Sequence, residues 1–140
     1  MRTLRERGHR VTPQRVAIIR EFVGRHDHPS AEEVHRKVAQ QFPMMALSTV
    51  YNTLRLLTQM GEAVEVSPTM PETRFDPDVR DHCHLTCLSC HRIVDLPMEA
   101  CTSAGELIAA ARDAGFEPVR QVYQVYGYCA ACQEGGGAAL

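Results

Sequence analysis

The metal-ligand side chains of this chain are concentrated in one stretch, RFDPDVRDHCHLTCLSCHRIVD, which runs from Arg74 to Asp95. It carries three histidines, three cysteines and four aspartates. Thiolates select zinc or iron–sulfur clusters, whereas carboxylates combined with imidazoles suit iron(II), manganese(II) or nickel(II). A single metal site rarely uses both kinds of ligand. The segment therefore predicts two metal sites that share one short piece of chain.

Four cysteines form two CxxC pairs, which together supply the four thiolates of a closed, tetrahedral structural zinc site. These ligands are Cys87, Cys90, Cys129 and Cys132. Because residues 91–128 lie between the pairs, the metal would join the end of this region to its start. A redox dithiol is the alternative for either pair alone. Cys83 and Cys101 stand outside the pattern and are assigned a structural or incidental place.

His82 and His84 alternate on a predicted strand, so both imidazoles face one side and Cys83 faces the other. In isolation, two hydrogen-bonded histidines on a polar strand face explain this motif equally well. Further oxygen and nitrogen ligands stand nearby in the sequence and could converge with them on one cation. They are Asp76, Asp81, Asp95, His26 and His28.

The composition excludes some classes of protein. The chain has 140 residues and is 44% hydrophobic, which allows one domain or two small ones. No apolar run approaches the roughly 20 residues of a membrane helix, and the segment MRTLRERGHR lacks the apolar core of a signal peptide. We therefore expect a cytoplasmic protein with no membrane partner. In that reducing compartment, six cysteines favour metal ligation or redox chemistry over structural disulfides.

Charge is distributed unevenly along the chain. Residues 1–60 contain ten Lys or Arg and five Asp or Glu, whereas residues 61–140 contain five and twelve. Such a split is often only solvated surface. Here the acidic half also holds the metal ligands, so the split favours a nucleic-acid-binding module coupled to a metal-binding module.

The basic half is predicted to form three helices and a hairpin. Thr12 caps a helix that begins at Pro13, Ser30 and Glu33 form a capping box, and the helix STVYNTLRLLTQM ends at Gly61. The segment AVEVSPTMPETRF then alternates as a two-stranded hairpin. This order is that of a winged helix-turn-helix, whose third helix enters the DNA major groove.

The outward positions of the third helix carry side chains that suit DNA. Arginine can bind a guanine edge and asparagine suits adenine. On the helix pattern alone, an ordinary polar helix face is the better interpretation, and the charge split and the hairpin reverse that preference. The predicted DNA-binding residues are Arg10, Arg15, Thr49, Tyr51, Asn52 and Arg55, and Gln59 lies on the same face.

The acidic half is predicted to form a small sheet with one helix. HRIVDLP has the pattern of a strand, SAGELIAAARDAG that of a helix with a capping box from Ser103 to Glu106, and FEPVRQVYQVYGYC that of a second long strand. A sheet this small leaves an edge and an apolar face to cover, which is typical of a dimerisation module. The expected fold class is α+β, with a winged helix followed by a small α/β dimerisation domain.

Several motifs, in order along nearly the whole chain, resemble the ferric uptake regulator family of bacterial metal-dependent repressors. They are GHRVTPQR, HPSAEEV, STVYNTLRLL, RFD, DHCHLTCLSCHRIVD and YGYCAAC. The resemblance implies a homodimer on an inverted-repeat DNA operator, with a winged-helix domain at 1–74, a hinge at 75–78, a metal-binding dimerisation domain at 79–134 and a flexible tail at 135–140. It also implies a structural Zn²⁺ at the four CxxC cysteines.

The resemblance further implies a regulatory Fe²⁺ or Mn²⁺ site. Its ligands would be His28, Asp76, His82, His84 and Asp95. An aspartate at position 95 resembles the peroxide-stress branch of the family. A histidine that many relatives have on the last strand is absent here, so the resemblance gives no further metal site on that strand.

A cation held by ligands from both halves would fix their relative orientation and favour the DNA-binding conformation. In the peroxide-stress branch, iron-catalysed oxidation of a ligand releases the DNA, and His28 and His82 are the expected targets. Two alternatives stay open. One is an iron-, manganese- or zinc-responsive repressor without peroxide sensing, and the other is a metal hydrolase or non-haem iron oxygenase, although no HExxH motif or phosphate loop is evident.

Overall fold

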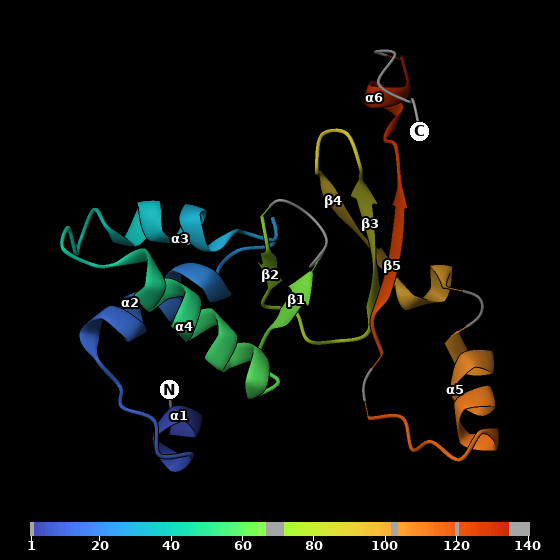
Figure 1. Ribbon diagram of the computed structural model, residues 1–140, viewed down its shortest axis with the longest axis horizontal. Helices are drawn as coiled ribbons and strands as arrows, with labels where there is room; N and C mark the ends of the chain where they lie inside the picture. Colours follow the sequence, from blue (N-terminus) through green and yellow to red (C-terminus); the bar gives the residue numbers. More distant parts are fainter. Residues whose placement is uncertain (1, 67–71, 102–103, 120, 135–140) are drawn as a thin grey trace. The chain divides into compact units, whose positions relative to one another are not determined.

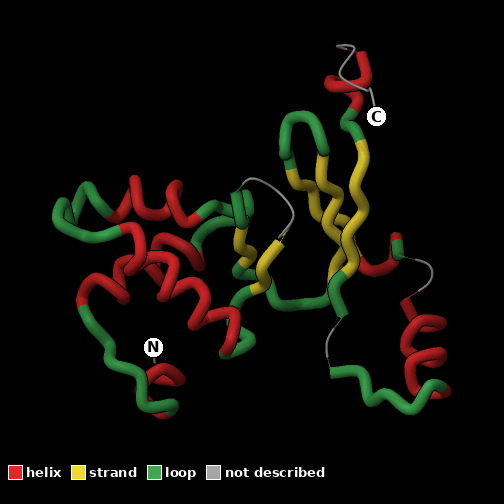
Figure 2. The backbone as a smooth tube through the Cα atoms, in the orientation of Figure 1, coloured by secondary structure: helices red, strands yellow, loops and turns green. Residues whose placement is uncertain are grey.

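The computed structural model describes residues 2–66, 72–101, 104–119 and 121–134. The chain divides into two compact units, Met1–Val79 and Arg80–Leu140, and each is considered by itself (Figure 1, Figure 2). The predicted tail at 135–140 lies outside the described residues. The hinge at 75–78 stays a prediction.

The first unit is a winged helix. Its elements are α1 (Arg2–Glu6), α2 (Pro13–Val23), α3 (Ala31–Val38), α4 (Leu47–Gln59), β1 (Val64–Val66) and β2 (Arg74–Asp76). Strands β1 and β2 pair antiparallel, with Val64 opposite Asp76. The predicted hairpin therefore forms, and its connecting segment 67–71 lies outside the described residues.

The helix boundaries follow the capping residues that the sequence predicts. The Thr12 hydroxyl accepts a hydrogen bond from the Arg15 amide at 3.2 Å, and Pro13 is the first residue of α2. At α3, the Glu33 amide donates to the Ser30 hydroxyl at 3.3 Å and the Ser30 amide donates to the Glu33 carboxylate at 3.0 Å, which completes the capping box. After α4, Gly61 takes a φ of +74°, which glycine adopts without strain.

One hydrophobic core joins the helices of this unit to its hairpin. Buried side chains at helical spacing contribute from α2, α3 and α4, and Phe75 contributes from β2. The Phe75 side chain is fully buried, and its amide donates to the Pro29 carbonyl at 3.1 Å. Consequently β2 is attached to the segment that precedes α3, and this attachment positions His28 and Asp76.

Replacing Ser30 with alanine should lower the free energy of unfolding by about 1 kcal/mol, because it removes the side-chain acceptor of the α3 cap. Urea denaturation followed by circular dichroism measures this change. Ser48→Ala is the matched control, since Ser48 is exposed on α4 and takes no part in a cap. Equal losses in the two variants would show that the α3 cap contributes nothing specific.

The second unit is built on a three-stranded sheet in the order β4-β3-β5. Its elements are β3 (His82–Cys87), β4 (Ile93–Pro97), the 3₁₀ turn η1 (Met98–Ala100), α5 (Ala104–Asp113), β5 (Tyr123–Gly127) and α6 (Ala130–Glu134). Strand β3 pairs antiparallel with β4 and parallel with β5. Within this unit, α5 stands beside the sheet and is not stacked over β3 and β4 in the view of Figure 1.

The second unit departs from the sequence prediction in two places. The predicted long strand FEPVRQVYQVYGYC is wrong in extent, because β5 covers only Tyr123–Gly127, and Pro118 has no amide hydrogen to contribute to a ladder. The short helix α6 was not predicted. The predicted strand HRIVDLP is confirmed over Ile93–Pro97, whereas the capping box at Ser103 lies outside the described residues.

Candidate metal centres and nucleic-acid interface

The four CxxC cysteines form one cluster in the second unit. The four sulfur atoms all lie within 4.8 Å of one another, and they belong to Cys87, Cys90, Cys129 and Cys132. The sulfurs of Cys90 and Cys129 are 3.7 Å apart. A tetrahedral zinc with Zn–S bonds of about 2.3 Å requires a sulfur–sulfur separation of about 3.8 Å. The cluster therefore has the donor type, the number of donors and the spacing of a structural zinc site.

Local structure positions these sulfurs. Cys87 ends β3, and the turn that carries Cys90 continues to His91, whose φ of +61° reverses the chain toward β4. The Cys129 amide donates to the Cys87 sulfur at 3.4 Å. Cys132 lies in α6, where its amide donates to the Cys129 carbonyl at 2.9 Å. The parallel pairing of β3 with β5 brings the two CxxC segments to the same end of the sheet.

The electrostatics of the cluster favour a bound cation. Backbone N–H groups of Cys90 and Cys129 donate toward Cys87 and lower the pKa of its thiol to about 6. The Ser89 hydroxyl lowers the pKa of Cys132, but hydrogen bonds with the sulfurs of Cys129 and Cys90, together with burial, raise it to about 11. The Cys87 thiol thus ionises readily and the Cys132 thiol resists ionisation. Crowded thiolates repel each other unless a cation neutralises their charge.

The first unit contributes a buried imidazole and carboxylate. His28 is 2% exposed and Asp76 is 3% exposed, and the His28 Nε2 lies 3.6 Å from the Asp76 Oδ2. Arg74 donates through Nη1 to the His28 carbonyl at 3.1 Å, and the Asp78 amide donates to the Asp76 Oδ1 at 2.8 Å. The first contact holds the backbone of His28 and the second holds the Asp76 carboxylate, both at the hairpin end of the winged helix.

His28 also adopts an uncommon backbone conformation. Its φ is +51°, in a region that few non-glycine residues occupy, although asparagine, aspartate and histidine occupy it more often than the others. The following residue is Pro29, which restricts the backbone of His28 further. Strained residues of this kind are found where the surrounding structure holds a side chain in a functional orientation.

The second unit contributes two imidazoles and a carboxylate. As the strand pattern predicts, His82 and His84 face the same side of β3, and their Nε2 atoms are 3.0 Å apart. The Asp95 Oδ1 lies 3.8 Å from each of these atoms, because β4 pairs His84 with Asp95. Adjacent ligands of a six-coordinate metal with bonds of about 2.1 Å are separated by about 3.0 Å. The spacing of the two imidazoles matches this value.

Residues of α4 divide into a buried face and an exposed face. Val50, Leu54 and Leu57 are buried in the core as predicted, whereas Asn52 and Arg55 are exposed and Thr49 is half-buried. Tyr51 is half-buried and its hydroxyl donates to the Glu32 carboxylate at 2.9 Å. Of the predicted DNA-binding residues on α4, Asn52 and Arg55 are therefore the most accessible to a bound duplex.

Two arginines are predicted to bind phosphates: Arg10 precedes α2, and Arg15 lies in its first turn. Arg10 is exposed, and the Arg15 guanidinium donates to the Arg10 carbonyl at 2.5 Å. This contact connects the α1–α2 loop to α2, so Arg15 has a structural part beside any contact with DNA.

Sequence reasoning missed Arg74. Besides its bond to the His28 carbonyl, its Nη1 lies 3.4 Å from the Glu33 Oε2, and it pairs with Ser30 in an isolated bridge. Arg74 thus connects the His28 segment, the cap of α3 and strand β2. Its place beside Phe75 and Asp76 in the motif RFD was the only feature of the sequence that pointed to it.

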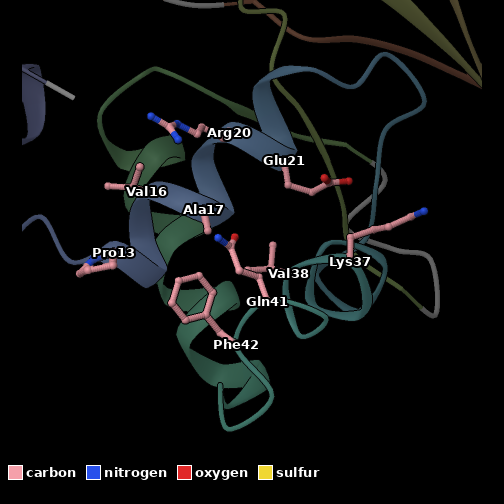
Figure 3. A pocket seen from close by; sticks show the side chains of 9 residues that line it. All are labelled: Pro13, Val16, Ala17, Arg20, Glu21, Lys37, Val38, Gln41 and Phe42. Carbon is pink, nitrogen blue, oxygen red and sulfur yellow. The ribbon is translucent and has the colours of Figure 1, made fainter.

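A pocket of about 470 Å³ lies between α2 and α3 in the first unit (Figure 3). Apolar side chains such as Val38 and Phe42 line it together with charged ones such as Glu21 and Lys37. No candidate metal ligand and no predicted DNA-binding residue lines it. The pocket is therefore separate from both candidate metal sites and from the predicted DNA-binding residues.

None of the described helices combines the length and apolar character needed to cross a membrane.

Comparisons with known proteins agree with these observations. The model of the family described as "Ferric uptake regulator family" matches residues 6–125. The peroxide-responsive repressor PerR of Staphylococcus epidermidis is 33% identical over 134 residues, which cover 96% of this chain and 88% of that protein.

Solved structures show the same fold. The peroxide stress regulator of Campylobacter jejuni aligns with a TM-score of 0.70 at 25% identity, over 84% of this chain and 86% of that one. The ferric uptake regulator Fur of Helicobacter pylori aligns with a TM-score of 0.77 at 17% identity, over 94% and 87%. The matched family and the PerR relative are regulators, so the alternative of a metal hydrolase or oxygenase is wrong. The chain belongs to the ferric uptake regulator family.

Proposed function

We propose that this chain is a homodimeric, metal-dependent repressor that acts in the cytoplasm and releases its operator when peroxide oxidises a ligating histidine. The observation that carries the proposal is the division of one ligand set between two units. His28 and Asp76 form a buried pair in the first unit, and His82, His84 and Asp95 form a cluster in the second. A cation that uses both sets would connect the DNA-binding unit to the rest of the protein.

The donor sets fit the metals proposed for them. Three imidazoles and two carboxylates suit iron(II) or manganese(II), and four thiolates suit zinc. Neither partial set of the regulatory site fills the coordination shell of a metal by itself, because one offers two donor residues and the other three. The metal would bind more tightly to a conformation in which both ligand sets contact it than to one in which only one set does. This difference in metal-binding free energy is the most that the metal can contribute to DNA binding.

DNA recognition is assigned to α4. The buried side chains Val50, Leu54 and Leu57 attach the helix to the core, and Asn52 and Arg55 lie on its exposed face. In a winged helix-turn-helix, this helix reads base edges in the major groove. Arg10, Arg15, Thr49 and Tyr51 are proposed to make supporting contacts at the same surface.

Arg55→Ala should weaken specific DNA binding by about 1–3 kcal/mol, which is the usual value of one arginine–guanine contact. The probe is a duplex enriched from a random pool by the manganese-loaded protein, and fluorescence anisotropy measures the affinity. Arg20→Ala removes an equal charge from α2 and is the control. Equal weakening on enriched and random duplexes would instead assign Arg55 to phosphate contact. A flat salt response of the parent protein would contradict DNA binding through phosphates.

Apolar surface on the second unit supports the homodimer. Large hydrophobic side chains there remain exposed, among them Leu107, Phe116, Val119, Val122 and Val125. Several of them line an apolar pocket of about 590 Å³ between α5 and the segment that precedes β5. Clustered exposed apolar side chains of this kind are typical of an interaction site, and a second copy of the same unit would bury them symmetrically. The resulting dimer would present two α4 helices to an inverted repeat.

Peroxide sensing is assigned to the imidazoles. Bound iron(II) would supply the electron that reduces hydrogen peroxide to an oxidant next to its ligands. An imidazole of His28 or His82 that gains an oxygen atom is a poorer donor, and the connection between the units is then lost. Because His28 is buried, its oxidised side chain has little room to reorient and restore the contact.

A further inference from the structure

Two cysteines outside the zinc cluster are paired with each other in the second unit. Cys83 and Cys101 form a disulfide, and their Cα atoms are 6.9 Å apart, just beyond the usual range of about 4.4–6.8 Å. The other four cysteines form no disulfide. We propose that Cys83 and Cys101 are a reversible thiol–disulfide site, which hydrogen peroxide oxidises without any need for the regulatory metal.

Strand geometry separates this pair from the zinc cluster. Cys83 lies four residues before Cys87 on β3, so the two side chains share a face of the strand but stand about 13 Å apart along it. His82 and His84 point to the opposite face. Cys83 is thus out of reach of the thiolate cluster and directed away from the imidazoles, and its sulfur partner is Cys101, which directly follows η1.

Exposure assigns different roles to the two sulfurs. Cys83 is 4% exposed, whereas Cys101 is half-buried. A small oxidant in solution therefore reaches Cys101 first, and Cys83 serves as the resolving thiol that is already adjacent to it. A buried cysteine without such a neighbour would be inert to oxidation. The arrangement is that of a reactive cysteine beside its resolving partner.

The chemistry balances with hydrogen peroxide as the oxidant. The Cys101 sulfur attacks one peroxide oxygen, the O–O bond breaks, and a sulfenic acid and one water are formed. The Cys83 sulfur then attacks the Cys101 sulfur, the S–O bond breaks, and the disulfide and a second water result. Overall, two thiols lose two hydrogens and two electrons, and one peroxide becomes two waters. A dithiol reductant returns both thiols by exchange and becomes a disulfide itself.

The bond joins β3 to the segment after β4. It closes a loop across 18 residues of separation, which includes β4 and its Asp95. Closing a loop of this size restricts the unfolded chain and stabilises the folded one. Oxidation should therefore raise the melting temperature of the zinc-loaded protein by roughly 5–10 °C. The same change makes β4 harder to separate from β3, the strand that carries His82 and His84.

Peptide mapping tests the proposal directly. Trypsin releases Cys101 as the only cysteine of residues 93–112, whereas Cys83 lies in residues 81–92 with Cys87 and Cys90. The reduced, zinc-loaded protein without iron is treated with peroxide, the remaining thiols are alkylated, and the digest is analysed by mass spectrometry. We expect the two peptides to become cross-linked with the loss of two hydrogen atoms, zinc to be retained, and dithiothreitol to reverse the link in the folded protein.

Variants decide which sulfurs react. Cys83→Ser and Cys101→Ser should each abolish the cross-link and the rise in melting temperature. If replacement of the buried Cys83 impairs folding, Cys101→Ser still tests the proposal, because Cys101 is only half-buried. A cross-link that persists in Cys83→Ser would overturn the proposal, as would a folded protein in which Cys101 stays alkylatable after peroxide, or a link that dithiothreitol cannot reduce without unfolding. Because no iron is present, the result does not depend on histidine oxidation.

Discussion

Cys87→Ser should deprive the protein of its zinc and unfold or monomerise the second unit. Structural zinc contributes on the order of 10 kcal/mol to the folding of small zinc modules, which is comparable to the whole stability of a typical domain. Here the thiolates join the end of β3 to the segment after β5, so the sheet loses its connection when the metal is lost. Zinc analysis, circular dichroism and sedimentation measure the three consequences.

A matched variant separates metal loss from the loss of a cysteine. Cys101→Ser also removes one thiol from the second unit, but Cys101 lies outside the cluster, so the reduced variant should keep its zinc. Cys129→Ser should behave like Cys87→Ser, and the double variant should be no worse, because the four ligands act as one unit. A folded, zinc-free Cys87→Ser dimer with an unchanged melting temperature would contradict the structural assignment.

Modest peroxide should oxidise a histidine ligand of the iron-loaded protein and leave the histidines of the manganese-loaded protein unchanged. The tryptic peptide of residues 26–36 is informative because it contains histidines but neither methionine nor cysteine. We expect this peptide to gain one oxygen atom at His28, or residues 81–92 to gain it at His82, with a parallel loss of operator binding. Fragment spectra distinguish His28 from the exposed His26 and from His35, whose Nε2 lies 2.8 Å from the Met45 carbonyl oxygen.

The alternatives give different results in the same experiment. Oxidation confined to Cys83, Cys101 or the zinc thiolates would transfer the sensing to sulfur chemistry. An iron-loaded protein that keeps its histidines and its operator after peroxide would be a repressor that responds to iron, manganese or zinc without sensing peroxide.

Local rules predicted the first unit well. Thr12, Pro13, Ser30 and Glu33 are cap residues whose effect depends only on neighbours a few positions away, and the helix periodicity identified the buried face of α4. The second unit was predicted less completely. The length of β5 depends on pairing with β3, a strand about 40 residues earlier, and α6 is too short to show periodicity.

The candidate sites show the same limit. Spacing alone indicated the four thiolates and the common face of His82 and His84. It could not show that Cys83 pairs with Cys101, because a disulfide depends on the placement of η1 relative to β3. Nor could it show the strained φ of His28 or the contacts of Arg74, because both arise where β2 packs against the segment before α3.

The most direct test of the central claim, that one cation uses ligands from both units, is a double-mutant cycle on manganese-dependent operator binding. The variants are His28→Asn and His84→Asn, since asparagine tolerates the positive φ of His28, and His26→Asn is the control. We predict that each ligand variant lowers manganese affinity by at least the roughly 10–100-fold that loss of an outer-shell partner costs and abolishes metal-dependent operator binding, and that the double variant binds the operator no more weakly than either. Full manganese affinity in His28→Asn, with the loss confined to His84→Asn, would place the ion in the second unit alone and contradict the account.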